Sequence, residues 1–197
     1  NPVTFVMPEE NVTLKACSAS QTNEYAVTVE HYLMGTDGTY PDIPYETTVK
    51  PYKYGAELNF TDAANEYEGF TLNIEKTKEM NAGYTGTVTG DVKLKIYYDR
   101  NRYTVTVEHY YMDTAGNYPE KPSVAEDLKP YYGETLVHKD LAREIKGLSF
   151  NENKTIQENG NRTQTQVTGN TVIRLYYDRS VCTVTYDYRT NGGTSAD

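Results

Sequence analysis

The sequence predicts an α+β fold, mostly β, in which one unit is built twice along the chain. The 197 residues include 20 tyrosines, 4 phenylalanines and no tryptophan, and aromatic and β-branched residues favour strands. Blocks of sequence also recur about 78 positions apart, a period long enough for each copy to fold by itself. We therefore expect tandem units arranged head to tail as an elongated rod.

The repeat is clearest in the first and last segments of each unit. Residues 25–32 read YAVTVEHY and residues 103–110 read YTVTVEHY, while YYDR occupies residues 97–100 and again residues 176–179. Residues 11–16 resemble the last strand of a unit, and residues 183–186 resemble the first. The predicted boundaries are the end of a preceding repeat at 1–22, full repeats at 23–101 and 102–180, and the start of a following repeat at 181–197. The chain is thus expected to be a piece of a longer array.

The first half of each unit predicts two strands. Val27, Val29 and His31 alternate with other residues, as expected for a strand with one apolar face. Turn-forming residues follow at 35–38 and 113–117, which suits a hairpin-like loop. A second extended segment then runs to Lys50 in one copy and to Leu128 in the other.

The second half predicts one short helix and two more strands. Asp140 is the predicted N-cap and Gly147 the stop signal, and Asp62 and Gly69 repeat them in the first copy. Alternation resumes at 70–74 and 148–150, a polar loop follows, and a final strand covers 92–98. This order suits a β-grasp (ubiquitin-like) fold. The linker at 99–102 contains neither glycine nor proline, so we expect a semi-rigid connection.

Charge and composition exclude several classes of function. The chain has 28 acidic and 19 basic residues, a net charge of -9 and no basic cluster, which argues against a nucleic-acid partner. Apolar runs are too short for membrane insertion or for the core of a signal peptide. Cys17 and Cys182 are far apart and form no CxxC motif, so neither zinc binding nor an intramolecular disulfide is expected. We expect no cofactor.

Histidines and acidic turns are the first candidate sites. His31 and His109 each follow a glutamate on the first strand, without the further ligands that a metal or catalytic site requires. We interpret them as packed, hydrogen-bonded histidines, and His138 has no histidine counterpart in the first copy. Asp37 and Asp113 lie in turn sequences that lack the pattern of a calcium-binding loop, so we interpret them as turn residues.

Four tyrosines are the candidate ligand-binding residues: Tyr32, Tyr97, Tyr110 and Tyr176. Strand alternation puts them on the face opposite the apolar residues, where we expect them to be exposed. Exposed aromatic rings offer a flat apolar face and a hydroxyl to a sugar, which would make this face a carbohydrate-binding surface. The alternative is cross-strand pairing of tyrosines that covers a small sheet. The sequence leaves both interpretations open.

With these motifs in view, the two full copies resemble MucBP-type (mucin-binding-protein) repeats of Gram-positive surface proteins. The opening VTVEHY strand, the Asp-x-x-Gly turn, a Tyr-Gly pair in mid-unit, the Gly69 and Gly147 positions, and the closing YYDR carry the likeness. The flanks, residues 5–16 and 184–194, resemble the internalin B-repeat (Listeria–Bacteroides type). These resemblances imply β-grasp-like folds in large, extracellular, cell-wall-associated proteins, often adhesins.

Two functional hypotheses follow. The first is a non-catalytic repeat region of a bacterial cell-surface protein, an adhesin stalk or spacer whose partners are neighbouring repeats of the same chain. The second is a module that binds host or environmental glycans or mucin through exposed tyrosines. An enzyme is not expected, because no Ser/His/Asp, Cys/His or paired-carboxylate set occurs in both copies.

Overall fold

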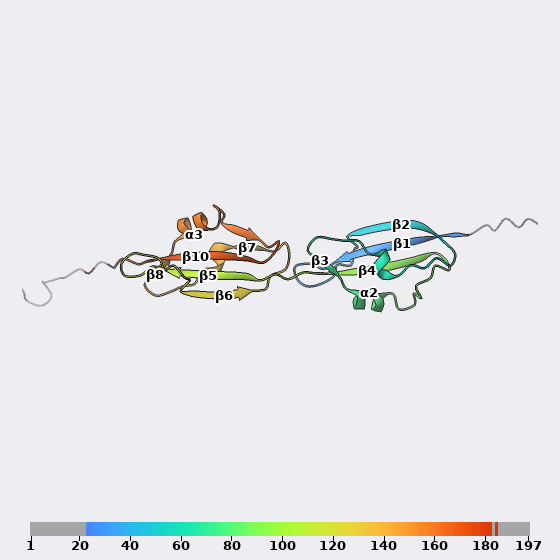
Figure 1. Ribbon diagram of the computed structural model, residues 1–197, viewed down its shortest axis with the longest axis horizontal. Helices are drawn as coiled ribbons and strands as arrows, with labels where there is room; N and C mark the ends of the chain where they lie inside the picture. Colours follow the sequence, from blue (N-terminus) through green and yellow to red (C-terminus); the bar gives the residue numbers. More distant parts are fainter. Residues whose placement is uncertain (1–22, 183, 185–197) are drawn as a thin grey trace, which may run out of the picture.

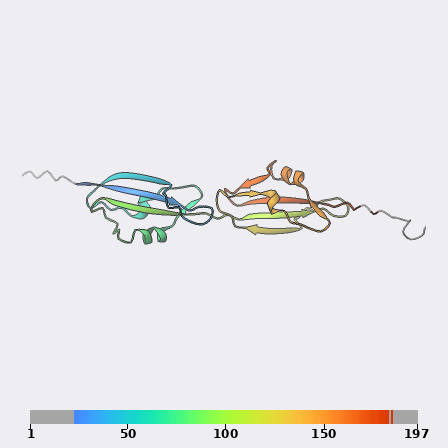
Figure 2. The same ribbon diagram turned by 180° about the vertical axis from the view of Figure 1, so that it is seen from behind.

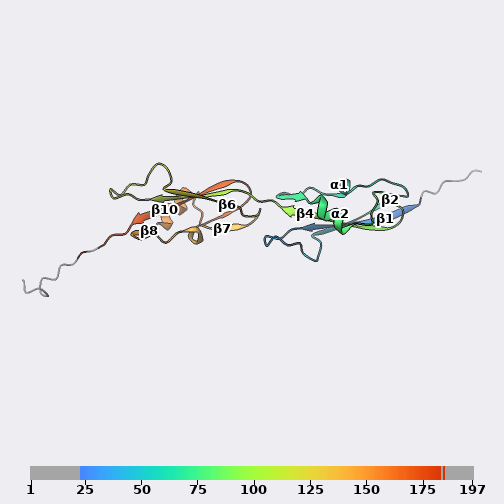
Figure 3. The ribbon, with the colours of Figure 1, turned by 90° about the horizontal axis from the view of Figure 1, so that it is seen from below.

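The computed structural model describes residues 23–182 and residue 184, and these residues form two sheet-based repeats (Figure 1). The two four-stranded sheets lie end to end, and the chain passes between them once, from β4 (Val92–Arg100) to β5 (Val105–Tyr111) (Figure 2). The view turned by 90° shows the same arrangement (Figure 3). We refer to residues 23–101 as the first repeat and to residues 102–180 as the second.

Two long parallel strands form the centre of the first repeat. β1 (Glu24–Leu33) runs parallel to β4, and β2 (Glu46–Lys53) pairs with the other edge of β1 in the antiparallel sense. β3 (Phe70–Leu72) pairs antiparallel with the end of β4, which gives the strand order β2-β1-β4-β3. The four predicted strands and their order along the chain are confirmed.

The second repeat uses the same order and adds a small sheet. β5 is parallel to β10 (Thr171–Arg179), with β6 (Val124–Leu128) and β8 (Leu148–Phe150) on the outside, in the order β6-β5-β10-β8. β7 (Thr135–Val137) and β9 (Gln164–Gln166) form a two-stranded antiparallel sheet of their own. In the first repeat a single bridge between Glu57 and Thr87 occupies the corresponding place.

One face of each sheet forms the core. The inward residues alternate along the two central strands, as predicted, and their side chains are almost completely buried. They are Val27, Val29, Leu94 and Ile96 in the first repeat, and Val105, Val107, Ile173 and Leu175 in the second. Each repeat therefore has an apolar core of its own.

The helix predicted to begin at Asp62 or Asp140 and to run to Gly69 or Gly147 is wrong in extent. α1 covers only Phe60–Ala63, and its N-cap is Asn59. Its counterpart, η1 (His138–Leu141), is a 3₁₀ turn without a side-chain cap. So short a segment buries no apolar stripe that would extend it. Gly69 and Gly147 instead form the turns before β3 and β8, with φ of 77° and 78°.

Each repeat also has a longer helix that was not predicted from the sequence, so the prediction of one short helix per repeat is wrong. α2 (Ile74–Met80) and α3 (Glu152–Glu158) follow Asn73 and Asn151, which cap them. Each cap side chain accepts a hydrogen bond from the backbone N–H three residues later, at 2.8 Å. The strand predicted for 70–74 ends at Leu72 because Asn73 starts this helix.

These longer helices close the outer edge of the last strand where the third strand no longer pairs with it. In the first repeat, Tyr97 N donates to Thr77 Oγ1 at 3.0 Å, and Asn81 bonds both backbone groups of Lys95. Thr155 and Asn159 repeat these contacts in the second repeat. An open strand edge invites pairing with other chains, so the helix protects the sheet on that side.

Several predictions concern residues outside the described ranges. The two partial repeats lie almost wholly at 1–22 and 183–197, as does Cys17, and Cys182 is free and exposed. No helix among residues 23–182 is long and apolar enough to cross a membrane. Within the same residues, no group of three or more His, Cys, Asp or Glu side chains is placed to hold a metal ion.

Candidate functional site

The four candidate tyrosines are buried, and the expectation that they are exposed is wrong. Tyr32 stacks on Tyr97 with ring centroids 4.8 Å apart and planes 12° apart, and Tyr110 stacks on Tyr176 at 4.9 Å and 12°. All four are at most 8% exposed. They do lie on the face of the sheet opposite the apolar core, but the two stacked rings of each pair cover each other. The structure therefore shows the cross-strand pairing that was the alternative interpretation.

In the first repeat, neighbouring side chains pack around the stacked pair. Tyr40 packs edge-on against Tyr97 at 4.9 Å, and the Lys95 ammonium lies 5.9 Å from the centre of the Tyr32 ring. The Tyr32 hydroxyl donates to Glu30 at 2.9 Å. Burial, followed by this hydrogen bond, raises the pKa of Tyr32 to about 12. A sugar would reach these ring faces only after the pair separated.

A buried histidine and tyrosine are linked in each repeat. Tyr98 Oη accepts from Asn65 N at 2.8 Å and lies 2.9 Å from His31 Nδ1, within hydrogen-bond distance of the imidazole. In the second repeat, Tyr177 and His109 make the same contact. Burial lowers the pKa of both histidines. They are packed, hydrogen-bonded histidines, as interpreted from the sequence.

A carboxylate cluster joins the helix cap to the last strand. Asn73 Nδ2 donates to both oxygens of Asp99, at 3.0 and 2.9 Å, while Asn73 Oδ1 caps α2. The Tyr40 hydroxyl also donates to Asp99. Asn151, Asp178 and Tyr118 repeat the cluster in the second repeat. These oxygens are saturated by the protein itself, which is the pattern of a structural network.

The acidic turns are also satisfied internally. Asp37 accepts hydrogen bonds from the backbone and the hydroxyl of Thr39, at 3.0 and 2.8 Å, and these bonds lower the pKa of its carboxyl group. Asp113 accepts from the backbone of Ala115 and Asn117. Both are the side-chain-to-backbone contacts of an Asx turn, in agreement with the turn interpretation.

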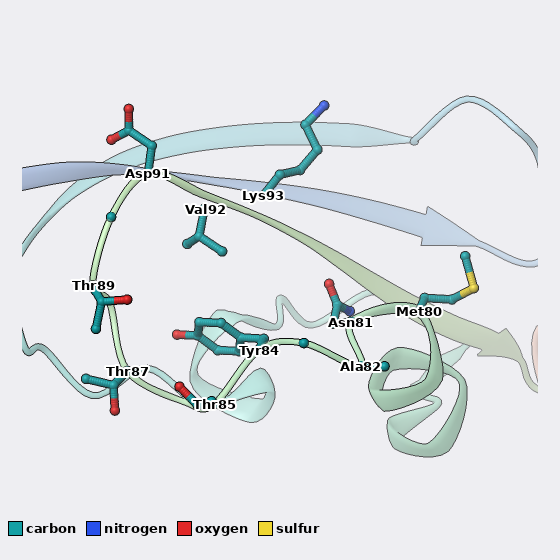
Figure 4. Close-up of a pocket in the computed structure, with 12 residues that line it drawn as sticks. Met80, Asn81, Ala82, Tyr84, Thr85, Thr87, Thr89, Asp91, Val92 and Lys93 are labelled. Atoms are coloured by element: carbon teal, nitrogen blue, oxygen red, sulfur yellow. The ribbon is translucent and has the colours of Figure 1, made fainter.

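One open pocket of about 440 Å³ lies in the first repeat, between the end of α2 and the start of β4 (Figure 4). It is lined by Thr85, Thr87 and Thr89, whose hydroxyls take part in no side-chain hydrogen bond among the described residues. The Tyr84 ring forms one side, and its hydroxyl is held by the carbonyl of Leu58 at 2.8 Å. The pocket offers free hydroxyls and one aromatic edge, without a nucleophile paired to a base.

A set of contacts that the sequence did not predict lies at the junction of the repeats. Arg100, the last residue of β4, donates through Nε to the carbonyl of Met34 in the first repeat, at 2.8 Å. Its Nη1 donates to the carbonyl of Tyr132 in the second repeat, at 2.9 Å. The guanidinium also lies 4.6 Å from the centre of the Phe70 ring. One side chain therefore bonds both repeats.

Backbone and ring contacts fix the same junction. Asn101 N donates to Gly69 O at 2.9 Å, and Tyr132 N donates to Asn101 O at 2.8 Å. The Tyr132 ring lies against the backbone of Gly69, where an added Cβ would come within 2.1 Å of the ring. It also packs against Phe70, with centroids 6.3 Å apart. A glycine is required at 69 both by its positive φ and by this ring.

Tyr131, the neighbour of Tyr132, makes a smaller contact with the first repeat. An added Cβ at Gly38, in the turn after β1, would come within 2.9 Å of the Tyr131 hydroxyl. Arg102 stacks on the Tyr131 ring, with its guanidinium carbon 3.8 Å from the ring centre. The short linker is therefore held on both sides by side chains, consistent with its lack of glycine and proline.

Comparisons with known proteins give limited likenesses. No family model and no curated protein matches the chain, flanks included. A solved structure described as Mub-RV is 11% identical, with a TM-score of 0.24, over 80% of this chain and 100% of that one. The type 2 repeat of the mucus binding protein MUB from Lactobacillus reuteri is 10% identical, with a TM-score of 0.25, over 79% and 100%. TM-scores so far below 0.5 assign no function.

Proposed function

We propose that this chain is a non-catalytic segment of an extracellular, cell-wall-associated bacterial surface protein, in which tandem β-grasp repeats at 23–101 and 102–180 form a stiff spacer. The observation that carries the proposal is the junction, where Arg100 hydrogen-bonds both repeats and Tyr132 packs on Gly69. A spacer holds its length only if adjacent repeats keep a fixed orientation. The surface location rests on the resemblance of the repeat motifs to MucBP-type repeats.

The internal networks support a structural role for each repeat. The stacked tyrosines, the histidine–tyrosine pair and the aspartate cluster occur in both repeats and are satisfied within the protein. The parallel central strands between two antiparallel outer strands, with a helix beside them, support the β-grasp assignment. Nothing in these networks requires a ligand.

The spacer is tested by residual dipolar couplings of the weakly aligned full chain. We expect one alignment tensor to fit both repeats, because a stiff junction aligns them together. Gly69→Ala pushes the Tyr132 ring away, and Tyr132→Ala removes it, so in both variants the two repeats are expected to require separate tensors.

Matched controls exist at equivalent positions. Gly147→Ala introduces the same strain, about 1 kcal/mol at a φ of 78°, at a site with no described atom within 4 Å. Tyr54 is the equivalent of Tyr132 and is 61% exposed, and Tyr54→Ala removes its ring. Both variants are expected to keep the single tensor. Separate tensors in the unmodified chain would refute the spacer.

We propose carbohydrate binding as a second function, since the pocket in Figure 4 is lined by three threonines whose hydroxyls make no side-chain hydrogen bond with a described residue. Polar sites for small ligands combine a few convergent hydrogen-bonding groups with an apolar or aromatic wall. If the pocket binds mucin-type glycans, Thr87→Val and Thr89→Val are expected to weaken signals on a glycan array at least several-fold. Thr168→Val, the equivalent of Thr89 in the second repeat, is the control. If both variants give the same array signals as the unmodified chain, the pocket is excluded as a glycan-binding site.

A further inference from the structure

The chain carries both halves of the junction twice but joins them only once. We call Gly38, Gly69 and Arg100 the tail surface of the first repeat, and Tyr132 with its neighbour Tyr131 the head loop of the second. The second repeat has a tail surface of its own, made of Gly116, Gly147 and Arg179, and the first repeat has a head loop with Tyr54.

The two tail surfaces have the same backbone geometry. Gly69 and Gly147 have φ of 77° and 78°, and Gly38 and Gly116 have φ of 78° and 84°. The hydrogen bond from Asn101 N to Gly69 O, at 2.9 Å, recurs from Ser180 N to Gly147 O at 3.0 Å. The second tail surface is thus already in the shape that receives Tyr132 in the first.

The occupancy of the two tail surfaces differs completely. An added Cβ at Gly69 or Gly38 would collide with Tyr132 or Tyr131, whereas Gly147 and Gly116 have no described atom within 4 Å of that position. Arg179, the counterpart of Arg100, is exposed and makes no side-chain hydrogen bond with a described residue. In the first repeat the equivalent donors of Arg100 bond the carbonyls of Met34 and Tyr132.

The two head loops show the complementary difference. Tyr54 N donates to Asn23 O at 2.9 Å, as Tyr132 N donates to Asn101 O at 2.8 Å. The Tyr54 ring packs on Tyr25 at 6.1 Å, as Tyr132 packs on Tyr103 at 6.4 Å. Tyr132 is half-buried against the first repeat, but Tyr54 is 61% exposed. An exposed tyrosine ring held in a fixed orientation is a ready contact group.

We infer that the tail surface of the second repeat is a docking site for the head loop of one further repeat of this same type. The occupant is identified by the internal junction, where this head loop already sits on this tail surface. The incoming ring packs on the Gly147 backbone, and Arg179 donates to the incoming carbonyl, as Arg100 does to Tyr132. The first repeat offers its exposed Tyr54 to the tail of a preceding repeat, with Lys53 in the place of Tyr131. This inference rests on the proposed spacer function.

The second tail surface differs from the first at two positions, and neither difference removes the contacts that docking requires. Leu148 stands in the place of Phe70, so the incoming aromatic ring packs against an aliphatic side chain there. Ser180 stands in the place of Asn101, whose contacts with Gly69 and Tyr132 are made by its backbone alone. The backbone contacts and the arginine donors therefore remain available.

The experiment extends the full chain by one repeat. Residues 1–180 are followed directly by residues 102–197, so that Ser180 precedes a second copy of Arg102 and the linker keeps its length. We expect residual dipolar couplings of all three repeats to fit one alignment tensor. Gly147→Ala or Arg179→Ala in this longer chain is expected to give the third repeat a tensor of its own, while the first two still share one.

The outcomes separate this inference from the spacer proposal. If the third repeat has its own tensor in the unmodified longer chain while the first two share one, the docking site is refuted and the spacer stands. If the first two already need separate tensors, the spacer itself fails. A third repeat that stays aligned in both Gly147→Ala and Arg179→Ala would refute docking at this surface. Gly147→Ala in the natural chain controls for strain alone.

Discussion

Replacing Tyr177 by alanine is expected to lower the free energy of unfolding of the second repeat by about 4 kcal/mol, the usual cost of removing a large buried aromatic side chain. Tyr177 is fully buried, and its ring packs edge-on against Tyr111 and Phe150. Its loss would also leave His109 Nδ1 and the backbone N–H of Arg143 without their partner. Urea denaturation, followed by resolved NMR signals of each repeat, measures the loss.

The phenylalanine variant separates the hydroxyl from the ring. Tyr177→Phe keeps the packing but leaves a buried imidazole nitrogen and a backbone donor unpaired, which costs about 1–3 kcal/mol. Tyr98→Phe is the matched change in the first repeat, where Tyr98 contacts His31 and Asn65 in the same way. We expect similar losses, each confined to its own repeat because each repeat has its own core. Unchanged stability in both variants would show that the histidine–tyrosine bond contributes nothing.

The strands and the duplication were predictable from the sequence because both depend on local pattern. Alternation at Val27, Val29 and His31 defines one face of β1, and the glycine at 69 marks a turn that needs a positive φ. The short helices could not be placed as well, since α1 starts at Asn59 rather than at Asp62 and its counterpart η1 has no side-chain cap. Boundaries of such short elements are set by single hydrogen bonds.

Burial of the stacked tyrosines could not be read from strand alternation alone. Alternation placed Tyr32 and Tyr97 on the face opposite the core, and this is where they lie. It gives no information on the loop that brings Tyr40 over Tyr97. The longer helix did have a sequence signal, Asn73 followed by residues that favour helices, but the alternating segment before it concealed the N-cap.

One apparent match in the sequence is out of register in the structure. Lys50-Pro51-Tyr52 resembles Lys129-Pro130-Tyr131, yet Val27 pairs with Lys50 while the equivalent Val105 pairs with Leu128. Lys129 therefore occupies the position of Pro51. The shift makes Tyr54 the structural equivalent of Tyr132. Strand pairing, unlike sequence matching, fixes that equivalence.

Mild acid is expected to destabilise the second repeat more steeply than the first. Burial lowers the pKa of His31 in the first repeat, and of His109 and His138 in the second. The charges of Glu46 and Glu126 oppose this shift at His31 and His109 but are weaker than the effect of burial. The unfolded chain, with an ordinary histidine pKa near 6.5, therefore takes up protons before the folded chain does.

The sign of the pH dependence follows from this difference. Stability is complete above about pH 6.5 and falls as the pH drops below it, by up to about 1.4 kcal/mol per pH unit for each histidine. Carboxylates with lowered pKa values, such as Glu30 and Glu126, stay ionised in this range in both states. Urea denaturation of each repeat between pH 7.5 and 5.5 measures the two slopes. Equal slopes would contradict the assignment of two buried neutral histidines to the second repeat.

His138 offers the sharpest control, because the first repeat has Phe60 in its place. His138 is buried, and its Nδ1 has no hydrogen-bond partner among the described residues, while Nε2 contacts Thr165 Oγ1 at 2.9 Å. His138→Phe removes the buried imidazole together with its contact to Thr165 Oγ1, so we expect the acid slope of the second repeat to become shallower. The reciprocal Phe60→His is expected to give the first repeat the steeper slope that the second one loses.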